Sequence, residues 1–287
     1  IVPIVTGMKV AYTPDPTATR EIVDILRHTG ANTMVATPTF LKMILAISSA
    51  DDLKKLRLVV TGAESLSPTI IDEFKAKASE NAHIIEGYGI TECAPALSLN
   101  PLGKQKLKSV GTFISTVEHL IVDIQTNQPL EQGKEGMLLV RGDNIFDGYL
   151  DKTVASPFVT VNGKEYYKTG DLGYVDSDGY LFITGRLKRF IKIAGEMISM
   201  PAIEQRLLEK YGSSDEVVLA VEGSDVIEPP QLVLFSKRNI DLAEVNQHLK
   251  SSGFSNLVKI HKIMIIDEIP LLGTGKTDYK VLKDLIR

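Results

Sequence analysis

Six short stretches combine glycines with polar or charged side chains. In chain order they are TGAES (61–65), GYGITE (87–92), RGDNIFDGYL (141–150), YKTGD (167–171), GRLKRFIKIAGE (185–196) and LLGTGK (271–276). In the second of them, Tyr88 offers an aromatic face, Thr91 a hydroxyl and Glu92 a carboxylate. Magnesium prefers few carboxylates plus phosphate oxygens, so this loop could hold a phosphate and its Mg²⁺. The same residues also fit a plain strand-to-helix turn with a threonine cap.

Two charged residues further along suit a ribose or a phosphate. Asp171 follows Gly170 in an expected turn, and its carboxylate could accept hydrogen bonds from both ribose hydroxyls. Arg186 stands at the end of an expected strand and could bind ribose or phosphate in a bidentate way. The alternatives are that Asp171 only forms the turn and that Arg186 only makes a surface salt bridge.

GTGKT (273–277) resembles a phosphate-binding P-loop in part only. That motif requires a glycine five positions before Gly275, where this chain has Pro270. What remains is Lys276 on a glycine-flanked tip just before an expected helix, where a mobile cation could reach into another domain's site. The alternative is a solvated loop lysine.

Composition favours a globular protein of about two domains. The 287 residues are 44% hydrophobic and 24% charged, with a net charge of −4. No part is strongly basic, so nucleic-acid binding is not expected. A solvated face is one interpretation of the two lysine-rich clusters, Lys104/Lys106/Lys108 and Lys188/Arg189/Lys192.

Other features limit the compartment and the cofactors. The single cysteine, Cys93, excludes an intrachain disulfide and fits a reducing compartment. The five histidines lie far apart, so a histidine metal site is not expected. No apolar run reaches the ~18 residues that span a bilayer. The chain opens at IVPIVTGMKVAY without a start methionine, and we expect it to be cut from something longer.

The predicted fold class is α/β, in three parts. Residues 1–104 are expected to be the C-terminal part of a parallel-sheet α/β subdomain that carries the adenine and phosphate loops, with helices on both faces. The expected strands are 8–12, 33–36, 57–60 and 83–89, and the expected helices are 17–28, one after Pro38 and one started by Ser67 and Pro68. Ligands bind beyond the carboxyl ends of such strands, where TGAES and GYGITE lie.

Residues 105–187 are expected to form an antiparallel, barrel-like subdomain. Its expected strands are 117–124, 136–142, 158–161, 166–169, 172–176 and 180–185, with hairpin turns at 162–163 and 176–179. Residues 188–287 are expected to be a small, mobile α+β lid. Its expected elements are strand 190–193, helix 201–211, strands 216–222 and 231–236, a helix started by Asp241, strand 262–267 and a helix started by Thr277.

In this order, the six stretches resemble the successive motifs of the acyl-adenylate-forming, or AMP-binding, superfamily. That superfamily includes acyl-coenzyme A (CoA) synthetases, luciferases and peptide-synthetase adenylation domains. The resemblance covers nearly all of the chain. Within the superfamily, GYGITECAPALSLN, IKIAGEMISM and PLLGTGKTDY look most like the acyl-acyl-carrier-protein synthetase part of bacterial 2-acylglycerophosphoethanolamine acyltransferases.

The resemblance implies a role for each of several residues. Those facing ATP and AMP would be Gly62, Ala63, Glu64 and Tyr88 at adenine, Asp171 and Arg186 at ribose, Thr91 at phosphate and Glu92 at Mg²⁺. Lys276 would bridge carboxylate and phosphate oxygens during adenylation. Lys188 would be the hinge of the lid, and Gly195 would let a pantetheine thiol pass close to the backbone. Weaker candidates for an acyl pocket are Thr37, Pro38 and residues 89–94.

The implied activity is ATP-dependent adenylation of a fatty acid, followed by thioester formation on acyl carrier protein, with Lys188, Arg189 and Lys192 as a docking patch. An acyl-CoA synthetase is the alternative, and a non-catalytic interaction module of the same fold is the second. The superfamily's phosphate loop is missing, so we expect it to precede Ile1 and expect these residues alone to be inactive. The implied location is cytoplasmic. In the full-length parent, the implied location includes the cytoplasmic face of the bacterial inner membrane, and the parent would associate with the membrane only through regions outside this chain.

Overall fold

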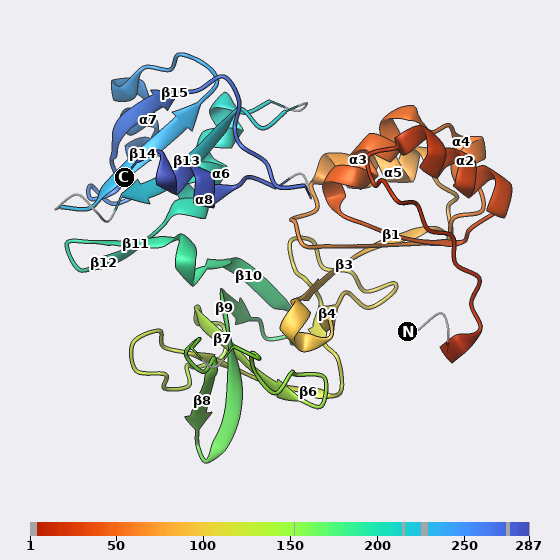
Figure 1. Cartoon of the computed structure of the whole chain (residues 1–287), viewed down its shortest axis with the longest axis horizontal. Coiled ribbons are helices and arrows are strands. Elements are labelled where there is room, and N and C mark those ends of the chain that lie inside the picture. The colour runs from red at the N-terminus through yellow and green to blue at the C-terminus, as the bar shows by residue number, and fades with distance from the viewer. Residues whose placement is uncertain (1–4, 152, 214–215, 225–228, 274–275, 287) are drawn as a thin grey trace. The chain divides into compact units, whose positions relative to one another are not determined.

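The computed structural model describes residues 5–151, 153–213, 216–224, 229–273 and 276–286 (Figure 1). The chain divides into two compact units, residues 1–169 with 173–183, and residues 170–172 with 184–287. The predicted fold class is confirmed, with a partly parallel sheet, an antiparallel half-barrel and a smaller α+β part. The boundaries predicted after residues 104 and 187 stay predictions. No helix in the described ranges is both long and apolar enough to cross a membrane.

A five-stranded sheet opens the first unit, in the spatial order β1-β2-β3-β4-β5. Its strands are β1 Thr33–Ala36, β2 Leu58–Gly62, β3 His83–Gly89, β4 Ala96–Leu99 and β5 Thr112–Phe113. The first three are parallel, as predicted, and β4 and β5 add in antiparallel fashion. The parallel strands therefore carry the TGAES and GYGITE loops at the same edge.

Helices cover this sheet on one side in the described residues (Figure 1). They are α2 Thr19–Thr29, α3 Pro38–Ile47, α4 Ala50–Leu53 and α5 Pro68–Lys77. All four share one core with β2, which includes Leu41, Val59 and Phe74. Val35 points the other way and is 79% exposed, so the expectation of helices on both faces is wrong here.

Local signals explain where these helices begin and end. The Ser67 hydroxyl accepts a hydrogen bond from Ile70 N at 3.4 Å, and Gly30 ends α2 in the left-handed region at φ 64°. Both were predicted. The predicted strand at 8–12 is wrong: these residues have no regular structure, and Tyr12 is 82% exposed. An apolar run without a neighbouring strand to pair with gains little from an extended form.

The half-barrel is an antiparallel sheet in the order β10-β9-β7-β6, with β8 paired to β9. Its strands are β6 Val117–Val122, β7 Gly136–Gly142, β8 Phe158–Val161, β9 Lys164–Val175 and β10 Leu181–Arg186. The predicted turn at Asn162-Gly163 is confirmed, with φ of 49° and 75°. The predicted break between 166–169 and 172–176 is wrong. β9 continues through it, because Gly170 takes a φ of +72° inside the strand.

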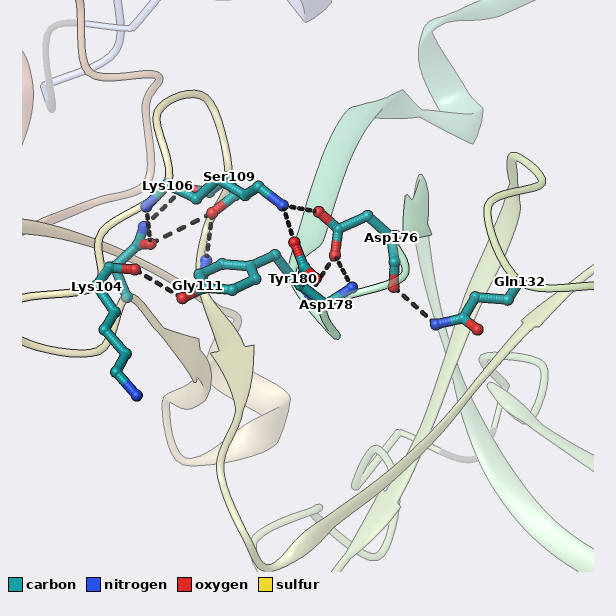
Figure 2. A network of polar contacts seen from close by, with 9 residues as sticks. Lys104, Lys106, Ser109, Gly111, Gln132, Asp176, Asp178 and Tyr180 are labelled. Carbon is teal, nitrogen blue, oxygen red and sulfur yellow. Dashed lines mark hydrogen bonds and ion pairs between the residues drawn. The ribbon is translucent and has the colours of Figure 1, made fainter.

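A polar network fixes the segment after β4 to the turn between β9 and β10 (Figure 2). Lys106 Nζ lies 2.5 Å from Asp176 Oδ2 and 2.8 Å from Asp178 Oδ2, and the Tyr180 hydroxyl donates to Lys104 O at 2.6 Å. Hydrogen bonding to the two carboxylates raises the pKa of Lys106. The Lys106 ammonium group is thus already paired with two carboxylates of this chain, so its role is structural rather than the binding of an anionic partner.

The second unit contains a three-stranded sheet, β13-β14-β15, and a hairpin, β11-β12. Its elements are the 3₁₀ helix η2 Leu187–Arg189, β11 Phe190–Ile193, β12 Glu196–Ser199, α6 Met200–Tyr211, β13 Leu219–Ser224, β14 Gln231–Ser236, α7 Leu242–Ser251, β15 Ile260–Ile265 and α8 Tyr279–Asp284. Ile203, Leu207, Leu234 and Leu249 are fully buried in one core.

The caps of the last two helices differ in how well they were predicted. The Asp241 carboxylate accepts from Glu244 N at 2.8 Å and begins α7, as predicted. The cap of α8 is Asp278, whose Oδ1 accepts from Lys280 N at 3.1 Å and Val281 N at 3.2 Å. The predicted start at Thr277 is wrong, because Thr277 pairs with Leu271 in an isolated β-bridge.

Candidate active site

An open depression of about 180 Å³ lies where β2 and β3 end. Its lining includes Val60, Gly62, Ala63, Gly87 and Tyr88. Closed ligand pockets commonly measure about 300–1,000 Å³, so this surface is one wall of a site rather than an enclosed pocket. The structure thus brings together Gly62, Ala63 and Tyr88, three of the residues assigned to adenine.

Two glycines of GYGITE pack closely against β4 and the residue before it. A Cβ on Gly87 would lie 2.5 Å from a methyl group of Leu99, and one on Gly89 would lie 1.7 Å from the Pro95 carbonyl oxygen. Gly89 is therefore required by the approach of β3 to the backbone that begins β4, whereas the clash at Gly87 is with the end of a flexible side chain, which can shift. Ala63 has a φ of +71°, which is a strained conformation for alanine and is typical of functional loops.

Glu64 turns its side chain toward the start of α3. Its Oε2 accepts from Thr39 N at 3.1 Å and from Thr39 Oγ1 at 2.6 Å. Its Oε1 is buried and has no hydrogen-bond partner among the described residues. Thr37 caps the same helix, because its hydroxyl accepts from Phe40 N at 3.3 Å. Only the main chain of Glu64 is therefore free to contribute to the edge of the depression.

Thr91 and Glu92 lie on a 3₁₀ helix, η1 Thr91–Cys93, which follows β3 after one residue, Ile90. The Tyr149 hydroxyl donates to Glu92 Oε1 at 2.9 Å, and this bond raises the pKa of Tyr149. Asn144 Nδ2 donates to Cys93 O at 2.8 Å, and the Cys93 side chain is fully buried. RGDNIFDGYL therefore supports the Glu92 loop.

The contact of Tyr149 with Glu92 was not predicted from sequence. Its only signal is a tyrosine two residues after Asp147 in a stretch that already matches the family pattern. In the described part of the chain, no group of three or more His, Cys, Asp or Glu side chains could hold a metal ion. A single carboxylate such as Glu92 is enough for a magnesium ion whose other ligands include phosphate oxygens.

Asp171 and Arg186 form an ion pair within the second unit. Arg186 Nε lies 2.8 Å from Asp171 Oδ1. Asp171 is buried, with 2% of its side chain exposed, whereas 66% of the Arg186 side chain is exposed. The expectation of a turn at Asp171 is wrong, since it lies inside β9. A buried acceptor beside an accessible guanidinium can bind a diol, because both ribose hydroxyls need an acceptor for their protons.

The remaining predicted residues also lie in the second unit. Lys188 is in the middle of η2. Gly195, at φ +91°, follows Ala194, at φ +50°, in the two-residue turn of the β11-β12 hairpin. Lys276 is half-buried, and its carbonyl accepts from Leu272 N at 2.7 Å. Thr274 and Gly275 of GTGKT lie outside the described residues.

Arg189 does not belong to an exposed docking patch. Only 11% of its side chain is exposed, and it forms ion pairs with Glu222 at 2.8 Å and Glu204 at 3.2 Å. The docking hypothesis is therefore wrong for this residue. A lysine-rich stretch does not reveal which of its cations the fold buries.

The family follows from a comparison with known proteins. Residues 1–150, just over half of the chain, match the family model described as AMP-binding enzyme. The chain belongs to the AMP-binding enzyme family. The superfamily predicted from the six motifs is confirmed.

Relatives of this AMP-binding family member carry the names of CoA ligases. It is 32% identical over 238 residues to "Probable 4-coumarate--CoA ligase 2" of Dictyostelium discoideum, covering 82% of this chain and 43% of that protein. It is 31% identical over 260 residues to "4-coumarate--CoA ligase 1" of Glycine max, covering 86% of this chain and 87% of that protein. The chain thus spans less than half the length of the Dictyostelium relative.

Solved structures agree on the fold of this family member. The crystal structure of ATP-bound MatB from Rhodopseudomonas palustris matches 93% of this chain and 53% of its own chain, with a TM-score of 0.75 and 25% sequence identity. This likeness supports the fold described above.

Proposed function

We propose that the protein carrying this chain is an ATP-dependent, AMP-forming acid–CoA ligase. The observation that carries the proposal is the pair of buried Asp171 and exposed Arg186, 2.8 Å apart, in a member of the AMP-binding enzyme family. The CoA ligase names of its curated relatives support the acyl acceptor. CoA, which sequence analysis gave as the alternative, is therefore the preferred acceptor.

The proposed reaction has two steps. A carboxylate oxygen of the acid attacks the α-phosphorus of ATP, and pyrophosphate leaves with the electrons of the broken P–O bond. The product is an acyl-adenylate. A thiol then loses its proton and attacks the acyl carbonyl, so that AMP leaves and a thioester forms. Mg²⁺ would neutralise charge on the phosphates when it is bound.

The chain's own residues would divide this work. Asp171 would accept hydrogen bonds from the ribose hydroxyls, with Arg186 beside it. Thr91 would donate to a phosphate oxygen, and Glu92, oriented by Tyr149, would hold the magnesium ion. The main chain at 62–64 and the ring of Tyr88 would contact adenine, which fits the place of Gly62, Ala63 and Tyr88 on one depression.

A rotation of the second unit would switch the protein from adenylation to thioester formation. Lys276 would stabilise negative charge that develops during adenylation. Lys188 would serve as the hinge, since a few residues at element ends commonly absorb such rotations. The main chain at Gly195 would flank the thiol. Gly195 has no side chain, and the space that a Cβ would occupy is open, with no other atom within 4 Å, so a thiol could pass there.

Acyl carrier protein is the second candidate acceptor. It is favoured by the resemblance of IKIAGEMISM and PLLGTGKTDY to acyl-carrier-protein synthetases. The same resemblance favours a fatty acid, whereas the curated relatives are named for 4-coumarate. The test of function must therefore offer both acids and both acceptors.

The decisive test is ATP–pyrophosphate exchange by the full-length protein, with fatty acids of several lengths and 4-coumarate in parallel. Exchange that depends on one acid is expected, followed by thioester formation on CoA. Thioester formation on carrier protein but not on CoA would make carrier protein the acceptor, and the proposed adenylation step would still hold. If no acid supports exchange, the proposal fails and a non-catalytic interaction module becomes the better account.

Replacing Asp171 with asparagine should abolish stabilisation by AMP. The amide keeps the size of the side chain, but it has one acceptor oxygen instead of two, and its NH₂ group can only donate. In the unchanged protein, AMP at a hundredfold excess over its dissociation constant should stabilise by about 2.7 kcal/mol. Thermal unfolding with and without AMP measures this difference. Glu165→Gln, at an exposed position of the same strand, is the control and should respond to AMP like the unchanged protein.

Replacing Tyr149 with phenylalanine should raise the Mg²⁺ concentration needed for half-maximal exchange by about tenfold. The hydroxyl that orients Glu92 Oε1 is lost, while the ring remains. Titration of the exchange rate with MgCl₂ gives the value. Tyr174→Phe, whose ring stacks on Phe182 at 4.9 Å, is the matched control. Equal Mg²⁺ requirements in the two variants would remove Tyr149 from the metal site.

A further inference from the structure

Arg189 lies at the start of the second unit and is held from three sides. Its Nη1 donates to Val221 O at 2.9 Å and to Glu222 Oε2 at 2.8 Å. Its Nη2 donates to Glu204 Oε2 at 3.2 Å. The last residue of η2 is therefore fastened to β13 and α6, although its sequence neighbour Lys188 is not part of this network.

Tyr279, the first residue of α8, completes the same cluster. Its ring centroid lies 3.4 Å from Arg189 Cζ, so the guanidinium rests on the aromatic face. Its hydroxyl donates to Glu204 Oε1 at 2.5 Å. Glu204 Oε2 also accepts from Val221 N at 2.8 Å, so both of its oxygens are occupied. A planar cation between a ring and carboxylates is a rigid arrangement.

The cluster adjoins two segments to which the proposed function assigns a task. Arg189 directly follows Lys188, the proposed hinge, and Tyr279 stands three residues after Lys276. The loop that carries Lys276 is closed by Leu272 N donating to Lys276 O at 2.7 Å and Asp278 N donating to Pro270 O at 2.7 Å. This closed loop leads straight into Tyr279. In Figure 1, α6, β13 and α8 lie together in the second unit.

We propose that Tyr279, Arg189 and Glu204 are positioning residues for Lys276. They join the segment after the hinge to the base of the Lys276 loop, so that both turn as one body. The inference rests on the proposed function of Lys276 and adds three residues to it. Catalytic groups must be held within about 0.5 Å of their productive position, and a misplacement of about 1 Å can cost a hundredfold in rate.

The test compares the two half-reactions in the full-length protein carrying Tyr279→Phe. This variant keeps the ring under Arg189 and removes the hydroxyl, which donates to Glu204 and also shares a hydrogen bond with the Thr277 side chain. Adenylation, measured by pyrophosphate exchange, should fall about tenfold in kcat with an unchanged KM for ATP. Thioester formation from added acyl-adenylate should stay within about twofold, because Lys276 serves only the first step.

Tyr211→Phe is the matched control. The half-buried Tyr211 ends α6, and its hydroxyl also donates to a glutamate, Glu244 Oε1 at 3.2 Å, but in a solvent-exposed hydrogen bond. It should leave both half-reactions unchanged. A second variant, Arg189→Lys, keeps the charge but loses the planar stack on Tyr279, and should show the same selective loss of adenylation. Melting temperatures of all three variants are measured first.

The outcomes separate this inference from the proposed function. If Tyr279→Phe behaves like Tyr211→Phe, or if both half-reactions fall together, the positioning role is wrong. Lys276→Ala is run beside them. A normal exchange rate in Lys276→Ala would overturn the proposed function itself. A strong loss in Lys276→Ala with none in Tyr279→Phe would overturn only the positioning role.

Discussion

Replacing Lys276 with alanine should slow acyl-adenylate formation by about 10²–10³-fold, which is the usual effect of removing one group that stabilises transition-state charge. The side chain makes no ion pair within the described residues, and the loop is closed by main-chain bonds at Leu272 and Asp278. Folding should therefore be unaffected, and the loss should lie in kcat. Exchange assays on the full-length protein measure it.

Two comparisons make this result specific. Lys280→Ala, four residues on and exposed at the start of α8, should exchange pyrophosphate at the normal rate. The Lys276→Ala variant should still transfer the acyl group from added acyl-adenylate to CoA. If Lys276→Ala loses transfer and keeps adenylation, the lysine serves the opposite half-reaction from the one assigned to it.

Replacing Arg189 with methionine should destabilise the second unit by about 3–5 kcal/mol, the usual cost of removing one partner from a buried ion pair. Glu222 and Glu204 would remain in place, with 6% and 15% of their side chains exposed and no cation between them. Native-state hydrogen exchange of β13 and β14 in the full-length protein measures this locally, which suits a chain of two units.

The loss should grow as pH rises. Burial raises the pKa of Glu204, and the positive charge of Arg189 is the largest effect that lowers it. Without Arg189, that pKa rises further. A carboxyl whose folded-state pKa is raised contributes stability that is present below the unfolded pKa and lost as pH rises through the folded pKa. The deficit should therefore be larger at pH 8 than at pH 5.

Two further variants check the cause of this loss. Arg206→Met removes an exposed pair with Glu209, 2.6 Å long, and should change stability by no more than about 0.5 kcal/mol. Adding Glu204→Gln to Arg189→Met should recover part of the loss, because it removes one of the two stranded carboxylates. A pH-independent deficit, or no recovery in the double variant, would mean that packing rather than charge explains the effect.

The elements of this fold could be predicted where local chemistry decides them. Ser67 with Pro68, Asp241 and Gly30 fix helix ends, and Asn162-Gly163 fixes a hairpin, because each satisfies or permits a backbone conformation within a few residues. The run at 8–12 failed because strand formation needs a partner. The break predicted at Gly170 failed because a positive φ is also tolerated inside a strand.

The candidate site was predictable as a set of motifs but not as a set of contacts. Gly62, Ala63 and Tyr88 meet because parallel strands end at one edge, which sequence order implies. The contacts of Glu64 and Arg189 could not be predicted in this way, because their partners, Thr39 and Glu222, lie 25 and 33 residues away in the sequence. Nothing in the local pattern distinguishes a carboxylate that caps a helix from one that faces a ligand.

Cys93 gives this site a chemical reporter. It is the only cysteine of the 287 residues, it is fully buried, and it directly follows Glu92. Alkylating reagents cannot reach its sulfur while the core around it is closed, so the labelling rate reports how often the protein opens around η1. A ligand that engages Thr91 and Glu92 should close the segment more often and slow the labelling. Ligand occupancy could then be followed by mass spectrometry, without a coupled assay and before the acid is known.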